Sequence, residues 1–386
     1  MKVHGLLVAG ALALLGASSL AKDFNVKDFG AVADGKTDSA AAVQQALDAA
    51  TKAGGGRVVV PAAKLPYLVE KTVFVRSSNI EILGQGAKLK LADNAVKGSH
   101  THVLHVTGTR KQSIANVVIR GLTIDANFWN QRARENDRRW SPRGLLVTHA
   151  RAVLIENVQV ERAWVSLSFA EGAEDAEARN TTVRRWHNDG FDAANGACNI
   201  RFVRCRAHDA MNQRAGGLPG SRDGAWEIED GVKQVTLTDC LVEGTDGEAF
   251  TVRSHNTTTV NQDIRFVRCK VSGPARVAFQ ILGRDHDTRT EQVFLEDCRT
   301  SGLLECSRGA DLVKVEGGEF GRVGLIGPRR VEIIGSTIGQ IEIDAREQSD
   351  GKATFRPSIT LQSVKLAEPA KILGDARAVR ILKGPK

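Results

Sequence analysis

What this chain lacks excludes several classes of protein. It has no low-complexity tract, and its longest apolar run, about fourteen residues near the start, is too short for a confident membrane span. No nucleic-acid-binding motif is present, and arginines interleave with acidic residues instead of forming a basic patch. Histidines and cysteines are not grouped at zinc-ligand spacings, and no calcium-loop motif occurs. We therefore expect a globular protein without a membrane span, a nucleic-acid partner or a zinc site.

The apolar run belongs to an N-terminal leader. One lysine, the apolar residues and then the small residues Ser19 and Ala21 follow the order of a signal peptide. No cysteine lies near the expected cleavage point after Ala21, which argues against a lipoprotein anchor. We expect residues 1–21 to be removed and the mature protein to be periplasmic or secreted.

The charge of the chain favours an anionic partner. The formal net charge is +8, and it falls to +7 without the single lysine of the leader. A basic protein attracts anions electrostatically. After export, acidic polysaccharide, lipopolysaccharide and cell wall are better candidates than nucleic acid, and we predict an acidic polysaccharide.

Short related runs recur along the chain, and each alternates apolar with polar residues. The runs are NVVIRGLTID, AVLIENVQVE, NIRFVRCRAH, QVTLTDCLVE, DIRFVRCKVS, QVFLEDCRTS and RVEIIGSTIG. Alternation predicts short strands with one buried face, and a unit that cannot bury its own apolar face must stack on its neighbours. Strands stacked in one direction at about 4.8 Å per step describe a right-handed parallel β-helix. We therefore predict an all-β, single-stranded parallel β-helix that forms one domain over residues 22–386.

One slot of the repeat holds a cysteine in four copies. These residues are separated by 35, 29 and 29 positions, and they are Cys205, Cys240, Cys269 and Cys298. Their common place in the repeat predicts an inward ladder of small buried side chains. Six cysteines in an exported protein leave disulfide or metal chemistry as the alternative.

A second series, of aromatic residues, follows the repeats: Phe169, Phe191, Trp226, Phe250 and Phe279. We predict that these rings stack along the core. Because side chains alternate across a strand, the residue after each ring should then point outward. The predicted outward residues are Ala170, Asp192, Glu227, Thr251 and Gln280.

The first mature segment, residues 22–62, is predicted to cap one end of the stack. It reads as strand, turn, helix, glycine stop and strand, and glycines 54–56 end the helix. A helix over the open end removes an exposed sheet edge. The weaker repeats of about 350–386 are predicted to cap the other end. The apolar stripe of the helix consists of Val43, Leu47 and Ala50.

The same segment carries a family resemblance. The pattern NVKDFGAVADGKTD…AGGGRVVVPA resembles the opening of the pectin-lyase-like β-helix superfamily, and the repeats extend the resemblance over most of the chain. Members of that superfamily include polygalacturonases, rhamnogalacturonases, pectate and alginate lyases, and alginate C5-epimerases. The resemblance implies the fold, but it does not select a reaction because one fold carries many chemistries.

The stretch HNDGFDAANGACNI resembles a polygalacturonase segment in which Asp-Gly-hydrophobic-Asp follows an asparagine–threonine pair. The resemblance implies that Asp189 takes a catalytic-acid position and that Asp223 belongs to a second aspartate pair. That pair is Arg222 and Asp223 here, GTDGEAF replaces the Gly-His-Gly turn, and FQI replaces Arg-Ile-Lys.

The stretch also resembles the alginate epimerases, whose motif runs Tyr-Gly-Phe-Asp-Pro-His. The central residues 190–192 match, whereas Asp189, Ala193 and Ala194 replace the tyrosine, proline and histidine. These replacements remove residues that would carry the proton transfer of an epimerase. The two family motifs are therefore both incomplete.

The outward residues predict a cluster of charge that does not depend on either family. Asp192 and Glu227 follow aromatic residues on neighbouring coils, so their backbones should lie one strand spacing apart. Alternation places Asp223, Glu227 and Glu229 on one face of the strand DGAWEIED. Arg253, two residues beyond Thr251, should neighbour Glu229 on the next coil.

Two reactions fit such a cluster. Clustered carboxylates raise the pKa of one member, and glycoside hydrolysis needs one protonated and one ionised carboxyl group. We assign that set to Asp189, Asp192, Asp223 and Glu227, with Arg253 beside it. Elimination from a uronate instead needs a base, here Arg253 or Lys233, and a cation to neutralise the carboxylate. We expect no cofactor, with calcium held by the acids as the alternative.

Two long insertions, residues 126–144 and 211–222, interrupt the coils. Their tryptophans and arginines suit a sugar acid, because aromatic rings stack on sugars and guanidinium groups bind carboxylates. The alternative is a solvated loop with local ion pairs. Including polar residues elsewhere on the outward face, the predicted substrate-binding residues are Trp129, Arg138, Arg139, Trp140, Arg143, His187, Arg214, Arg222, Glu229 and Lys233.

These observations predict an exported single-domain enzyme that hydrolyses an acidic polysaccharide in the manner of a polygalacturonase. We expect it to be a monomer. A polysaccharide lyase or C5-epimerase on the same fold is the second interpretation. The incomplete motifs leave a third, a non-catalytic glycan-binding β-helix.

Overall fold

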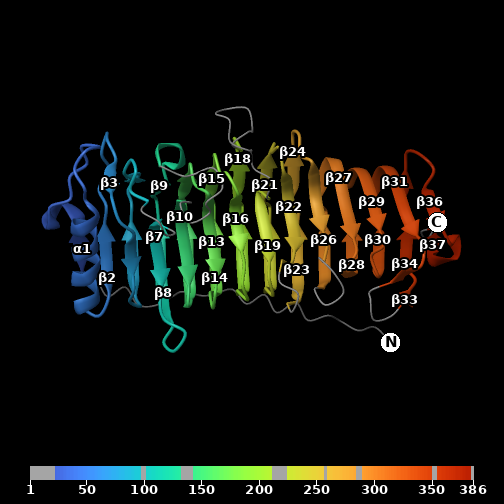
Figure 1. Cartoon of the computed structure of the whole chain (residues 1–386), viewed down its shortest axis with the longest axis horizontal. Coiled ribbons are helices and arrows are strands. Elements are labelled where there is room, and N and C mark those ends of the chain that lie inside the picture. Colours follow the sequence, from blue (N-terminus) through green and yellow to red (C-terminus); the bar gives the residue numbers. More distant parts are fainter. Residues whose placement is uncertain are drawn as a thin grey trace.

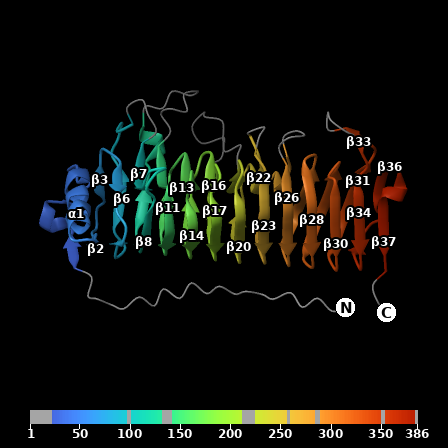
Figure 2. The ribbon, with the colours of Figure 1, turned by 90° about the horizontal axis from the view of Figure 1, so that it is seen from below.

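The computed structural model describes residues 22–96, 101–131, 142–210, 224–255, 259–283, 289–349 and 354–383. The strands stack along one long axis in the order of the sequence (Figure 1). This is the predicted right-handed parallel β-helix, and its stack is regular from end to end in the perpendicular view (Figure 2). The expected leader, residues 1–21, lies outside the described residues. Within the described residues, no helix is long and apolar enough to cross a membrane.

The coils build three faces, and the first is a 14-stranded parallel sheet. Its strands are β1 (Asp23–Asn25), β2 (Gly56–Val59), β5 (Ile80–Leu83), β8 (Ile114–Arg120), β11 (Ala150–Glu156), β14 (Glu174–Arg179), β17 (Cys198–Val203), β20 (Lys233–Thr238), β23 (Asn261–Val267), β26 (Thr290–Glu296), β28 (Ala310–Glu316), β30 (Arg330–Ile334), β34 (Ser358–Gln362) and β37 (Val379–Leu382). The last two strands belong to the segment after residue 350, which therefore continues the stack.

The second face consists of shorter strands. They are β3 (Tyr67–Val69), β6 (Lys88–Leu91), β9 (Thr123–Asp125), β12 (Gln159–Glu161), β15 (Thr182–Arg184), β18 (Arg206–His208), β21 (Leu241–Glu243), β24 (Lys270–Ser272) and β35 (Lys365–Leu366). Three long strands run through both the second and the third face: β27 (Arg299–Ser307), β29 (Glu319–Ile326) and β31 (Thr337–Ala345). These long strands join the two faces into one 21-stranded sheet.

The third face carries the predicted site. Its strands are β4 (Val73–Val75), β7 (His102–Thr107), β10 (Arg143–Thr148), β13 (Val165–Ala170), β16 (Asp189–Ala193), β19 (Trp226–Glu229), β22 (Glu248–Arg253), β25 (Val277–Ile281) and β36 (Lys371–Gly374). Outside the three faces, β32 (Gln348–Ser349) and β33 (Thr354–Phe355) pair antiparallel. Short 3₁₀ turns occur at η1 (Val26–Phe29), η2 (Phe128–Asn130) and η4 (Ala376–Ala378).

The predicted cysteine ladder is confirmed at the turn between the first and second faces. The residue before each of the four cysteines has a left-handed φ of 51 to 54°, which bends the chain toward the second face. Each thiol donates a hydrogen bond to a carbonyl oxygen of the preceding coil, over 3.2 to 3.5 Å. All six cysteines of the chain are free thiols, so the disulfide alternative is wrong. The four ladder cysteines therefore act as small buried groups that satisfy backbone carbonyls.

The aromatic stack is confirmed in four of its five members. Phe191, Trp226, Phe250 and Phe279 are register partners, and their successive ring centroids lie 4.3, 5.0 and 5.0 Å apart. Phe169 was placed wrongly, because it pairs with Ala193 while Leu167 pairs with Phe191. Alternation puts residues 167 and 169 on the same buried side, so only the register between coils distinguishes them.

The predicted N-terminal cap is also confirmed. Helix α1 (Ala40–Lys52) covers the first coil, and its buried residues include Val43, Leu47 and Ala50 (Figure 1). Glycines 54–56 follow the helix with φ values of 82, 135 and 152°. A Cβ at Gly55 would lie 2.7 Å from the Asn79 carbonyl oxygen, so the chain needs glycine where it turns from the helix into β2.

Thiol labelling tests this arrangement of cysteines. Five of the six cysteines are buried and Cys198 is partly exposed, so we expect one thiol to react quickly in the folded protein and six after unfolding without reductant. Ellman's reagent provides the measurement. Cys198→Ser should remove the fast reaction and leave five slow thiols. Fewer than six reactive thiols in the unfolded, unreduced protein would contradict the ladder and indicate a disulfide.

Candidate active site

A row of outward side chains crosses the third face, one from each coil. Its members are consecutive register partners, and we call them the site row: Ser168, Asp192, Glu227, Thr251 and Gln280. The pairing of Asp192 with Glu227 confirms that these two carboxylates lie on adjacent coils. Ser168 occupies the place expected for Ala170, because of the register described above. All members except Gln280 are buried although they point away from the core.

Asp192 has an unusual environment for a carboxyl group. It is 6% exposed, and the Ser168 hydroxyl donates a hydrogen bond of 2.6 Å to its Oδ2. Burial, reinforced by the negative charge of Glu229, raises the pKa of Asp192 to about 7, against the opposing effects of Ser168 and Arg143. Its buried Oδ1 has no hydrogen-bond partner in the part of the chain that the structure describes. Asp192 can therefore gain or lose a proton near neutral pH.

Glu227, in contrast, is engaged on both oxygens. The Arg253 guanidinium forms an ion pair with Oε1, and the Gly224 N–H donates to Oε2 over 3.3 Å. Glu227 is 2% exposed, and a buried carboxylate of this kind is stable only while its partner stays in place. Neighbouring coils thus carry one carboxyl group that titrates and one that is held as an ion pair.

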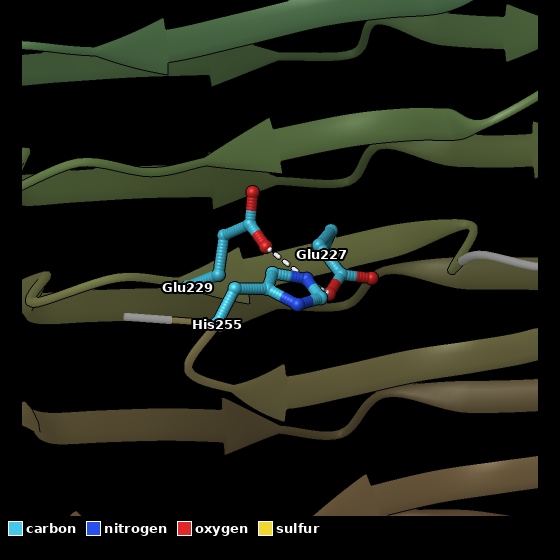
Figure 3. A group of neighbouring side chains, drawn as sticks. All are labelled: Glu227, Glu229 and His255. Carbon is cyan, nitrogen blue, oxygen red and sulfur yellow. Dashed lines mark ion pairs between the residues drawn. The ribbon is translucent and has the colours of Figure 1, made fainter. Parts of the chain in front are cut away.

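A second row lies two residues further along the same strands. Glu229 pairs in register with Arg253, as the sequence predicted. His255 follows β22 and brings its Nε2 to 2.8 Å from Glu229 Oε2 and 3.8 Å from Glu227 Oε1 (Figure 3). Its backbone N–H donates to Asp230 Oδ1 over 2.6 Å. The hydrogen bond to Glu229 raises the pKa of His255, which favours a positively charged imidazole beside the site row.

Sequence reasoning missed both Ser168 and His255. Ser168 was missed because the predicted register paired Phe169 with Phe191, which placed Ala170 beside Asp192. His255 had a detectable signal, because Thr251, Arg253 and His255 alternate along the chain just as the outward residues of a strand do.

The Glu227, Glu229 and His255 side chains are also the described groups that could hold a metal ion, since their ligand atoms lie within 4.8 Å of one another. Two carboxylates and an imidazole form a mixed oxygen and nitrogen donor set. That set suits zinc or manganese better than calcium, which prefers oxygen ligands. A metal ion would have to displace the Arg253 guanidinium from Glu227 and the His255 proton.

The remaining predicted residues have varied positions. Asp189 is 5% exposed and accepts a 2.6 Å hydrogen bond from Asn188, but it lies on the opposite side of β16 from Asp192. His187 packs against both Trp164 and Phe128, at centroid distances of 4.6 and 4.8 Å. Asp189 therefore lies next to the aromatic residues around His187 and is not part of the site row.

Three further predicted residues lie among the described ones. Arg143 starts β10 and lies close enough to Asp192 to lower its pKa. Trp129 is 40% exposed and packs edge-on against Phe128. Lys233 is exposed at the start of β20 on the first face, away from the site row. The other six candidates lie outside the described residues: Arg138, Arg139, Trp140, Arg214, Arg222 and Asp223.

The fold and the site row together define a pectin-lyase-like β-helix protein with a carboxylate cluster on its third face. The family described as rhamnogalacturonase A/epimerase, pectate lyase-like, matches residues 24–303. The chain belongs to this family.

Individual curated proteins are similar to this chain over shorter segments. The chain is 36% identical over 122 residues to mannuronan C5-epimerase AlgE3 of Azotobacter vinelandii, and 37% identical over 114 residues to alginate lyase 7 of the same organism. These segments cover 29% and 27% of this chain but only 6% and 13% of the relatives. The A-module of mannuronan C-5 epimerase AlgE6 from Azotobacter vinelandii shares the fold, with a TM-score of 0.62 and 19% identity over 94% of this chain and 100% of the module.

The raised pKa of Asp192 predicts a pH-dependent effect of removing its charge. In the folded protein the pKa is about 7 against an ordinary 3.8, so Asp192 stabilises the fold at low pH and loses this contribution as pH rises through about 7. Asp192→Asn should therefore raise the free energy of unfolding by about 2 to 4 kcal/mol at about pH 9 and have little effect at about pH 4.

Urea unfolding of both proteins at the two pH values measures this difference. Glu305→Gln is the matched control, because Glu305 is a half-buried carboxylate further along the same face. An equal effect of Asp192→Asn at both pH values would contradict the assigned protonation.

Proposed function

We propose that this protein is an enzyme that acts on an acidic, uronate-containing polysaccharide by removing the proton at C5 of a uronate residue. The observation that carries the proposal is the open Oδ1 of Asp192, a buried carboxyl group with a pKa of about 7. A general base is most effective when its pKa lies near the working pH. The partial similarity to enzymes named as mannuronan C5-epimerases and an alginate lyase supports a uronate polymer as the substrate.

The charges around Asp192 also suit a uronate. Removal of the C5 proton places negative charge on the adjacent carboxylate, which a fixed cation stabilises. Arg253 and the positively charged form of His255 lie on the row next to Asp192, and Arg143 approaches from the preceding coils. These cations can bind the carboxylate while Asp192 faces the C5 hydrogen.

Hydrolysis, the reaction first expected from the sequence, fits this arrangement less well. It needs two carboxyl groups available to the glycosidic bond, one as acid and one as base or nucleophile. Glu227 is held by Arg253 and by a backbone N–H, and Glu229 is held by His255. Asp192 therefore offers the only carboxyl oxygen of the site row that lacks a partner among the described residues.

Elimination can be completed by this one group. The ionised Asp192 takes the C5 proton, the C5–H electron pair forms a C4–C5 double bond, and the C4–O4 bond breaks. The protonated Asp192 then returns its proton to O4, so that no further reactant is required. Epimerisation shares the first step but ends with delivery of a proton to the opposite face of C5.

Product analysis tests this function. The full chain is incubated in D₂O with polymannuronate, alginate and polygalacturonate. Elimination yields shorter chains with an unsaturated, ultraviolet-absorbing end, and epimerisation yields uncut chains with deuterium at C5. Asp192→Asn should lower the rate by about 10² to 10⁴-fold. Glu332→Gln, which removes an exposed carboxylate on β30 of the first face, should retain the rate. Saturated products with new reducing ends would establish hydrolysis instead, and bound but unaltered polymer would establish a glycan-binding role.

The pH profile tests the role of Asp192 separately. As the base, Asp192 must be ionised, so kcat/KM should rise with pH through about 7. It should fall again where His255 loses its proton, above the ordinary pKa of histidine, because Glu229 raises that pKa. His255→Gln should remove the fall at high pH and leave the rise in place. A rate that decreases through pH 7 would show that Asp192 acts as an acid.

A further inference from the structure

The outward row of the third face does not end at Gln280. It continues through register partners on the following coils, which are Glu305, Gly324, Glu342 and Lys371. A cavity of about 590 Å³ opens on this C-terminal part of the same face. Its walls come from β27, β29 and β31 and from the segment that includes β36. One continuous row of side chains therefore connects Asp192 with the cavity.

Gly324 helps to create this cavity. It stands in the outward row between Glu305 and Glu342, at a position where the other coils carry a side chain. A Cβ added to Gly324 would meet only the Leu303 side chain, at 3.6 Å. The lack of a side chain thus leaves space above the sheet.

The charges that line the cavity are unequally paired. Asp344 binds Arg346 and Glu342 binds Lys371 over 3.0 Å, whereas Glu368 accepts a hydrogen bond of 3.0 Å from the neutral side chain of Gln340. The remaining ionisable residue of the lining, Arg322, is exposed and forms no ion pair within the described chain. The cavity therefore offers one guanidinium group that is not already committed to an acid.

The cavity also has exposed apolar walls. Ile326 is 49% exposed and Leu373 is 39% exposed, which places both among the few large apolar side chains that the described surface leaves open. An apolar wall beside a guanidinium group matches a uronate residue, whose C–H face is apolar and whose carboxylate binds arginine in two parallel hydrogen bonds.

We propose that this cavity is a distal subsite for a uronate residue of the same polymer that reaches Asp192, with Arg322 binding its carboxylate. The inference rests on the proposed function for the choice of ligand. Five coil steps separate Asp192 from Gly324, or about 24 Å at about 4.8 Å per step. A polymer lying along the row spans that distance, whereas a short oligomer does not. The subsite therefore selects long chains and strengthens their binding without taking part in the chemistry.

Calorimetric titration of the full chain tests the subsite. The protein carries Asp192→Asn so that the ligand is not consumed, and the probes are oligomannuronates and oligogalacturonates of defined length. We expect a long oligomer to bind one per chain and a short oligomer to bind two per chain, one at each end of the row. Adding Arg322→Ala should weaken the long oligomer about tenfold and reduce the short oligomer to one per chain. Gly324→Leu, which fills the cavity, should have the same two effects.

Arg380→Ala is the matched control, since Arg380 is another exposed arginine without an ion pair among the described residues, but on β37 of the first face. It should bind both oligomers as the parent does. Thermal unfolding confirms that each variant is folded before the titration. Unchanged binding by folded Arg322→Ala and Gly324→Leu variants would overturn the subsite. A parent protein that is a dimer and that Gly324→Leu converts to a monomer would also overturn it, because a second copy of the chain would then occupy the cavity.

These results are independent of the reaction. A protein that binds oligomers in this manner but yields no product would disprove the proposed function and leave the distal subsite in place. If the protein yields product but the Arg322→Ala variant binds oligomers as the parent does, the proposed function would stand and the distal subsite would be disproved.

Discussion

Main-chain pairing between successive coils determines where every functional group of this protein lies. Each strand pairs with the equivalent strand of the next coil, so a side chain on one coil has a fixed neighbour about 4.8 Å away. This constraint brings Asp192 beside Glu227 although 34 residues lie between them in the sequence. It also places Arg253 beside Glu229. The described members of the site row therefore all come from paired strands of neighbouring coils and not from a loop.

In the site row and the second row beside it, the charge state of each acid depends on which partner reaches it. Glu227 receives a guanidinium group and Glu229 receives an imidazole, so both can remain charged when little exposed to water. Asp192 receives a hydroxyl group from Ser168, which satisfies one oxygen but does not neutralise the charge. Burial then raises its pKa into the range where proton transfer is most useful. Of these three neighbouring acids, Asp192 can exchange a proton near neutral pH, whereas Glu227 and Glu229 are held in ion pairs.

The sequence was sufficient for the fold because the fold is periodic. The repeated slot of Cys205 and its equivalents, and the alternation in each run, identified the coils and the adjacency of Asp192 and Glu227. The sequence was insufficient where two registers between coils would leave the same alternation of apolar and polar residues. Leu167 and Phe169 are both apolar and inward, so nothing in the residues themselves showed which of them faces Phe191. Ser168 was missed for that reason, and the cavity at Gly324 required the three-dimensional path of β27, β29 and β31.

The thiol ladder has a consequence for how the protein can be made. Because each of the four ladder thiols donates to a carbonyl group and all six cysteines are free, the described fold contains no disulfide between coils. Its formation therefore needs neither an oxidant nor a disulfide isomerase. The same fold should form whether or not a reductant is present, so the protein can be refolded from the denatured state without control of thiol oxidation.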